Sequence, residues 1–61
     1  MINMTAIYLQ LALSHAKNEK YDLVVYRLTR ALAEANRLHD RQVQGVVLRL
    51  LNIARKRARH A

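Results

Sequence analysis

The sequence contains no cysteine, no proline, no tryptophan and no phenylalanine, and it has one glycine in 61 residues. Without cysteine, neither a disulfide framework nor a thiolate metal site can stabilise the chain. The scarcity of proline and glycine excludes a turn-rich β-sandwich or barrel, a collagen-like chain and a proline-rich linker. Acidic residues are few as well. The chain has four Asp and Glu and eleven Lys and Arg, which gives a net charge of +7.

What is present is a large share of hydrophobic residues, 52% of the chain, which argues against disorder. The length allows one small domain, which we expect to span residues 1–61. A chain this short buries only about 60% of the surface that it exposes when unfolded, so its fold needs very good helix packing or self-association. No hydrophobic run approaches the roughly 18 residues that a membrane span needs, and the N-terminus is a poor signal peptide. We therefore expect a cytoplasmic protein.

Apolar residues recur at three- and four-residue spacing along three segments, which is typical of helices with one buried face. The sequence thus predicts an all-α three-helix bundle, with helices at about residues 3–17, 21–38 and 41–58. The second segment has the clearest stripe: Tyr21, Val24, Val25, Leu28, Ala31, Leu32, Ala35 and Leu38. The inner stripe of the third is Val43, Val46, Val47, Leu50, Ile53 and Ala54.

Residues at the ends of these segments fit helix boundaries. Asn3 or Thr5 is suited to cap the first helix, and Asp40 is suited to cap the third, since their side-chain oxygens accept N–H groups of a first turn. Asn18 is the expected left-handed residue that closes the first helix. Gly45 interrupts the third helix at a cost of about 1 kcal/mol relative to Ala, which a close helix crossing at this position would explain.

The third segment is apolar on more than one side, because Leu48 and Leu51 extend its apolar surface beyond a single stripe. A helix of this kind needs more than one neighbour. The other two helices cover one side, and a second copy of the chain is the simplest cover for the other. The sequence therefore predicts a homodimer whose self-contact is formed by Val47, Leu48 and Leu51.

The first two segments resemble a single tetratricopeptide repeat, a helical hairpin with a W-x2-L-G-x2-Y and A-x3-F signature. The corresponding residues here are Tyr8-x2-Leu11-Ala12-x2-His15, Val24-x3-Leu28 and Ala31, with a similar turn at residues 18–22. The resemblance covers residues 6–38, and residues 41–59 would form the helix that seals the pair. His15 replaces the aromatic residue, Val24 replaces the small one, and the final proline is absent. The resemblance implies a protein-binding scaffold without catalysis.

Basic residues are concentrated in the last third of the chain, where residues 41–61 carry five Arg, one Lys and no acid. This asymmetry indicates an anionic partner, either an acidic protein or DNA or RNA. Three arginines of the second segment, Arg27, Arg30 and Arg37, would extend the surface if they face the same way. The candidate residues for contact with the anionic partner are Arg49, Asn52, Arg55, Lys56, Arg57 and Arg59.

The alternatives for this basic helix differ in the features that support them. A helix-turn-helix is not favoured, because the turn lacks a glycine and the third helix begins with an apolar run at Val43, Val46 and Val47. The three tyrosines lie outside the basic segment, which weakens stacking on single-stranded nucleic acid. A membrane-surface role ranks third, because the helix lacks Trp and Phe anchors.

No residue pattern supports catalysis, a cofactor or a metal. The histidines His15, His39 and His60 are each more than twenty residues apart, so none has zinc-ligand spacing. Ser14 and His15 are adjacent and point about 100° apart on a helix, so they cannot form a nucleophile–base pair. The sequence therefore predicts a non-enzymatic regulatory or adaptor module that binds an acidic protein and self-associates. The alternative is a nucleic-acid-binding accessory protein.

Overall fold

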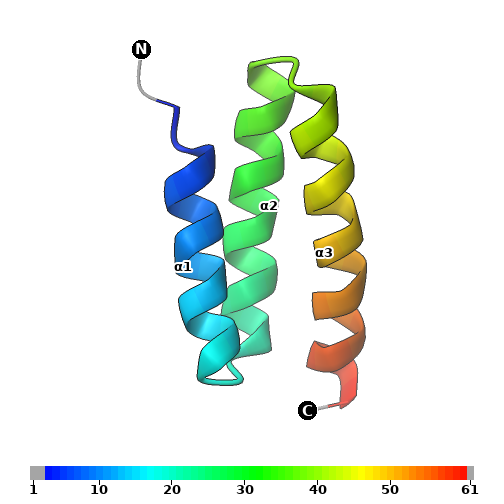
Figure 1. Cartoon of the computed structure of the whole chain (residues 1–61). Helices are drawn as coiled ribbons and strands as arrows, with labels where there is room; N and C mark the ends of the chain where they lie inside the picture. The colour runs from blue at the N-terminus through cyan, green and yellow to red at the C-terminus, as the bar shows by residue number, and fades with distance from the viewer. Residues whose placement is uncertain (1–2, 61) are drawn as a thin grey trace.

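The computed structural model describes residues 3–60 and contains three α-helices that run antiparallel to one another in chain order (Figure 1). Helix α1 spans Thr5–Lys17, α2 spans Tyr21–Arg37 and α3 spans Arg41–His60. The expected all-α class is confirmed within these residues. The expected domain also includes residues 1, 2 and 61, which lie outside the described part of the chain.

The two turns that connect the helices have the same backbone geometry. Each contains one left-handed residue, Glu19 with φ of 57° and His39 with φ of 55°. The next N–H in the chain then reaches back over the helix end. Lys20 donates to the carbonyl of His15 at 2.9 Å, and Asp40 donates at 3.0 Å to the carbonyl five residues before it. These are Schellman turns, and the two copies reverse the chain twice in the same manner.

The residues that begin and end the helices differ partly from expectation. Asn18 has φ of −98° and is the C-cap of α1, so the prediction that it is left-handed is wrong. A Schellman turn places its left-handed residue one position after the C-cap. Asp40 caps α3 as predicted, since its Oδ1 accepts the N–H of Val43 at 3.2 Å. At the start of α1, the N-cap position is Met4, which offers no side-chain cap, and Asn3 one residue before it accepts the N–H of Thr5 on its Oδ1 at 2.9 Å.

Helix α2 lies between α1 and α3 and supplies half of the buried apolar residues. Four of these eight residues are alanine, and small side chains let the helix backbones approach closely. The largest fully buried side chains are those of Val47 and Leu51 on α3. The buried apolar residues are Ala12 on α1, Val24, Leu28, Ala31 and Ala35 on α2, and Val47, Leu51 and Ala54 on α3.

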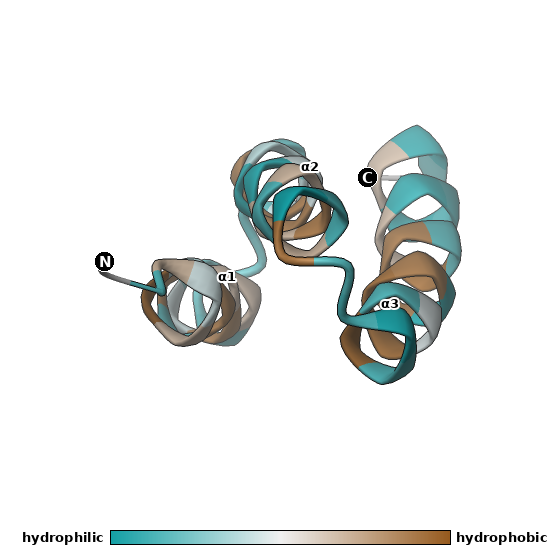
Figure 2. Cartoon of the chain, turned by 90° about the horizontal axis from the view of Figure 1, so that it is seen from above, coloured by the Kyte–Doolittle hydropathy of each residue, from teal (hydrophilic) through white to brown (hydrophobic). Residues whose placement is uncertain are grey.

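Helices α1 and α3 do not pack on each other. Both have Cα atoms within 8 Å of α2, and in the described part of the chain no Cα atom of α1 comes within 8 Å of one in α3. Figure 2, the view from above, shows the two helices on either side of α2. The fold is thus two consecutive hairpins that share α2, and α3 does not seal the first hairpin as expected. The reason is that α3 buries only a narrow stripe against α2.

Gly45 does not mark a close helix crossing. A Cβ atom built on this residue would have no neighbour within 4 Å. Its φ is not in the left-handed region, so a side chain would cause no backbone strain either. The expected crossing is therefore wrong, and the glycine occupies a position that the structure leaves open.

Candidate functional site

The separation of α1 from α3 leaves an apolar groove along one face of the molecule. Helix α2 forms its floor, α1 and α3 form its walls, and its volume is about 580 Å³. Leu13 lies on the α1 wall, Val24 and Leu28 on the floor, and Leu50 and Ile53 on the α3 wall. All three helices are therefore needed to build this site, although no Cα atom of one wall lies within 8 Å of one in the other.

Large apolar side chains on the walls of this groove remain open to solvent. Leu13 is 59% exposed, Leu50 is 40% exposed and Ile53 is 52% exposed. The groove was not predicted from the sequence, and Leu50 and Ile53 were expected on an inner stripe. The unusual width of the apolar surface of α3 indicated an uncovered site, but this width was attributed to contact with a second copy of the chain. Periodicity gives the face of a helix that is apolar, and the width of that face exceeds what α2 covers.

The predicted self-association surface is not present as one patch. Val47 is fully buried and Leu51 is 1% exposed, because both pack against α2 inside the chain. Leu48 is 48% exposed. Only Leu48 of the three is thus available to another molecule, and the assignment of Val47 and Leu51 to a self-contact is corrected.

Arginines lie along the α3 side of the groove. Arg57 lines it directly, and its guanidinium carbon lies 5.7 Å from the centroid of the Tyr21 ring on α2. A second depression, of about 600 Å³, adjoins the groove at Leu9 and includes Arg41 and Arg49 near the start of α3. The groove is thus mostly apolar, with one guanidinium in its lining and two more in the depression that adjoins it.

The remaining basic residues of α3, other than Arg41 and Arg49, are exposed and do not line the groove or the depression that adjoins it. Arg55 and Arg59 line a depression of about 370 Å³ that they share with Asp22 of α2. Lys56 and Asn52 are exposed, as are all the predicted anion-binding residues of α3. Within residues 3–60, no carboxylate lies within 4 Å of a basic group of α3. The predicted set is thus divided, with Arg57 in the groove, Arg49 exposed beside the adjoining depression, and the others on the outer side of the helix.

The three arginines of α2 do not continue the basic surface of α3. Arg30 lies 5.7 Å from the centroid of the Tyr8 ring on α1, at the edge of α2 opposite α3. Arg27 lies over the ring of the tyrosine that precedes it, at 5.2 Å. Arg37 forms an ion pair with Glu34, with 2.6 Å between Nε and Oε1. Arg30 thus reaches toward α1, whereas Arg27 and Arg37 contact residues of α2 itself.

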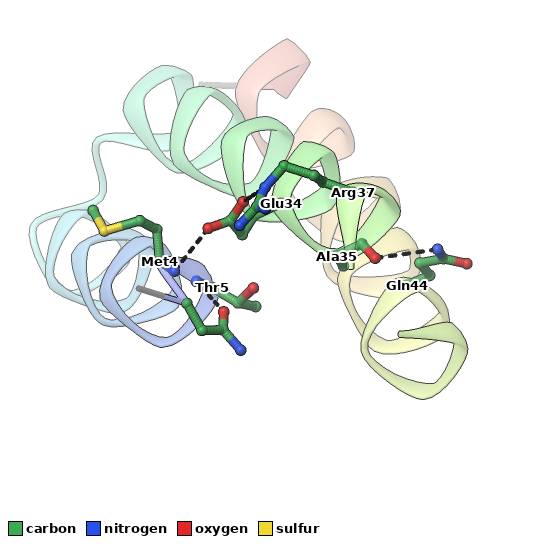
Figure 3. Close-up of polar contacts among 7 residues, drawn as sticks. Met4, Thr5, Glu34, Ala35, Arg37 and Gln44 are labelled. Atoms are coloured by element: carbon green, nitrogen blue, oxygen red, sulfur yellow. Dashed lines mark hydrogen bonds and ion pairs between the residues drawn. The ribbon is translucent and has the colours of Figure 1, made fainter. Parts of the chain in front are cut away.

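Glu34 joins the start of α1 to α2 (Figure 3). Its Oε2 accepts the backbone N–H of Met4 at 2.9 Å, while its Oε1 accepts Nε of Arg37. The hydrogen bonds from Arg37 and from the Met4 N–H lower the pKa of Glu34 below its usual value. On the other side of α2, Nε2 of Gln44 donates to the carbonyl of Ala35 at 3.4 Å. One polar contact therefore ties each neighbouring helix to the same end of α2.

Groups that could hold a metal ion do not come together in residues 3–60. No cluster of three or more His, Cys, Asp or Glu side chains occurs there. His15 is half-buried on α1 and its Nε2 is buried without a hydrogen-bond partner, whereas His39 and His60 are exposed. The side chains of the groove offer apolar contact, the Tyr21 ring and one guanidinium, which suits binding.

Comparison with known proteins gives no relative. No protein-family model matches the chain, and no curated protein sequence or solved structure matches it significantly. In the described residues, no helix has both the length and the apolar character that crossing a membrane requires. The geometry of the chain itself is therefore the evidence for its function.

Proposed function

We propose that this chain is a non-enzymatic adaptor module that binds another protein through the groove between α1 and α3. The observation that carries the proposal is the exposure of Leu13, Leu50 and Ile53 together in one groove. Covering apolar surface gains about 25 cal/mol per Å², so these side chains favour an apolar partner. The volume of the groove falls within the range of about 300–1,000 Å³ that ligand pockets typically have.

Two sequence features support the same role. Residues 6–38 resemble a tetratricopeptide hairpin, which implies a protein-binding scaffold. The net charge of +7 favours a partner that is acidic. Self-association is the other way to cover the groove, and it stays a prediction. A monomeric mass by light scattering at micromolar concentration would contradict the dimer.

A display experiment tests groove binding without assuming what the partner looks like. A library of random peptides is selected against the wild-type chain, and the selected peptides are then tested on two double variants. The groove variant is Leu13→Gln with Ile53→Gln, and its matched control is Ile7→Gln with Leu48→Gln. The control changes one exposed residue on the same two helices, outside the groove. All chains must first give the same helical circular dichroism.

We expect peptides that bind the wild type and the control but lose about tenfold or more affinity for the groove variant, since buried contacts at the centre of an interface dominate its energy. If no selected peptide distinguishes the two variants, the proposal fails.

A second function rests on a different observation, the row of exposed residues Arg49, Asn52, Lys56 and Arg59 along the outer side of α3. They recur at three- and four-residue spacing, and no carboxylate lies within 4 Å of their basic groups among the described residues. Such a row can follow the phosphates of a nucleic acid, where binding weakens steeply with salt because counterions are released.

Titration against duplex DNA and single-stranded RNA tests this second function, at about 50 and 200 mM salt. The row variant replaces Arg49, Lys56 and Arg59 with Gln, and the control replaces Arg30 and Lys17. Binding that falls with salt and is lost only in the row variant supports it. Binding that is absent at low salt contradicts it.

A further inference from the structure

The charge in the groove itself is positive. Among residues 3–60, Arg57 is the only charged residue that lines it, and Arg41 and Arg49 line the depression that adjoins it at Leu9. Two acidic residues of the described chain, Glu19 and Asp22, line a separate depression that meets the groove at Tyr21. A partner segment that fills the groove must therefore be apolar in its middle, and it gains from carboxylates where it passes the arginines.

The backbone of the walls restricts the conformation of the occupant. Both walls and the floor are helices, whose backbone N–H and C=O groups are already bonded within each helix. An extended segment would find no free backbone edge here, and its own buried N–H and C=O groups would be left without partners at considerable cost. A helix satisfies its backbone internally and presents only side chains, so it is the conformation that this apolar groove accepts.

A second copy of the chain does not supply such a helix. Helices α1 and α3 contain no Asp or Glu at all. Helix α2 has Asp22 and Glu34, but its apolar face is already the floor of the groove and the centre of the core. Two copies also bring together net charges of +7 each, which repel. The occupant must therefore come from another protein.

We infer that the groove binds an acidic amphipathic helix of a partner protein. Its apolar side chains, spaced at i, i+3 or i+4 and i+7, lie against Leu13, Leu50 and Ile53. Its carboxylates lie opposite Arg57 and, toward the start of α3, Arg49. This inference rests on the proposed function, binding of a protein in the groove, and adds the class of partner and its conformation.

Four synthetic peptides test the inference. The first is an amphipathic helix about five turns long with Leu on one face and Glu on the others, capped at both ends. The second replaces every Glu with Lys. The third has the composition of the first in an order without helical periodicity. The fourth is the first peptide with one proline at its centre, which breaks the helix. Each carries a dye, and binding is followed by fluorescence anisotropy.

Variants of the chain locate the site. The Leu13→Gln/Ile53→Gln and Ile7→Gln/Leu48→Gln pairs are used again. Arg57→Gln removes the guanidinium that lines the groove, and Lys17→Gln is its matched control, an exposed cation of α1 that does not line it. We expect the acidic helix to bind the wild type and both controls alike. Its affinity falls about tenfold or more in the groove variant and severalfold in Arg57→Gln.

The outcomes distinguish a failure of this inference from a failure of the proposed function, which is binding of a protein in the groove. Equal binding of the Glu and Lys peptides, or equal binding of the proline and unbroken peptides, overturns the acidic helix. If displayed peptides bind in the groove while the acidic helix does not, the inference alone is wrong. When neither kind of peptide depends on Leu13 and Ile53, both fail. A dimer mass that only the groove variant loses assigns the groove to a second copy and also overturns the inference.

Discussion

The carboxylate of Glu34 on α2 accepts the backbone N–H of Met4 at 2.9 Å, across thirty residues of sequence. An N–H group at the start of a helix has no partner within that helix, so a side chain must supply one. Glu34 does so from the neighbouring helix, and its other oxygen accepts Nε of Arg37 at the same time. This contact fixes the start of α1 against α2 at the end of the hairpin that has no connecting turn.

Glu34→Gln should therefore destabilise the chain in a manner that depends on pH. The folded-state pKa of Glu34 is lowered, whereas the unfolded value is about 4.3. The stabilisation is thus fully present above the unfolded pKa and is lost as pH falls through the lower folded pKa. Thermal unfolding at pH 7 and at pH 3 measures it. The melting temperature of the wild type should be higher than that of Glu34→Gln at pH 7, and the two values should approach each other at pH 3.

Glu19→Gln is the control for that experiment, because it also removes one carboxylate but from an exposed side chain that forms no ion pair between helices among residues 3–60. A difference between wild type and Glu34→Gln that is the same at both pH values would show that the ionised carboxylate is not what joins Met4 to α2.

His39→Gly should stabilise the chain. His39 has φ of 55°, a region that costs an L side chain about 1–2 kcal/mol and that glycine enters freely. After the larger backbone entropy of unfolded glycine is subtracted, we expect a gain of up to about 1 kcal/mol, or roughly 4–8 °C in a chain this size. Asn18→Gly, at φ of −98°, should bring no gain. Thermal melts of the two variants decide between backbone strain and a general effect of glycine in turns.

The sequence was sufficient for the helices and insufficient for their arrangement. Apolar spacing and the Asp40 cap are local properties, so they indicate where α3 begins without knowledge of its neighbours. Whether α3 packs on one helix or two depends on the side chains at the crossing. Here the small Ala31 lies in the core with residues of α3, and α3 packs against α2 while its Cα atoms stay more than 8 Å from those of α1. The spacing of apolar residues does not indicate whether α3 packs on one helix or on two.

The same limit explains the candidate site. Arg49 and Lys56 were correctly expected at the surface, because a charged stripe opposite an apolar one points to solvent. Ile53 and Leu51 both count as apolar in the sequence, yet one is exposed on the groove and the other is 1% exposed. Separating them required knowledge of which face of α3 packs against α2, which only the folded chain provides.

Gly45→Ala should stabilise α3. Alanine is favoured over glycine inside a helix by about 1 kcal/mol, since it restricts the unfolded backbone. The space around a Cβ at this position is open, so no clash offsets the gain. The gain should appear in urea denaturation as a higher midpoint with an unchanged slope. A loss of stability instead would mean that a neighbouring backbone approaches Gly45 in solution.

Leu51→Ala and Leu48→Ala should differ strongly in their effect on stability, although both remove the same atoms from α3. Leu51 is packed against α2, so its truncation costs about 2–5 kcal/mol, which is comparable with the whole stability of a domain this small. Leu48 is 48% exposed, and its truncation should change stability by less than about 0.5 kcal/mol. Helical circular dichroism at 25 °C should thus be largely lost in the first variant and retained in the second. If Leu48→Ala also unfolds the chain, Leu48 is buried in solution by a second molecule, and the self-association predicted from the sequence would regain its support.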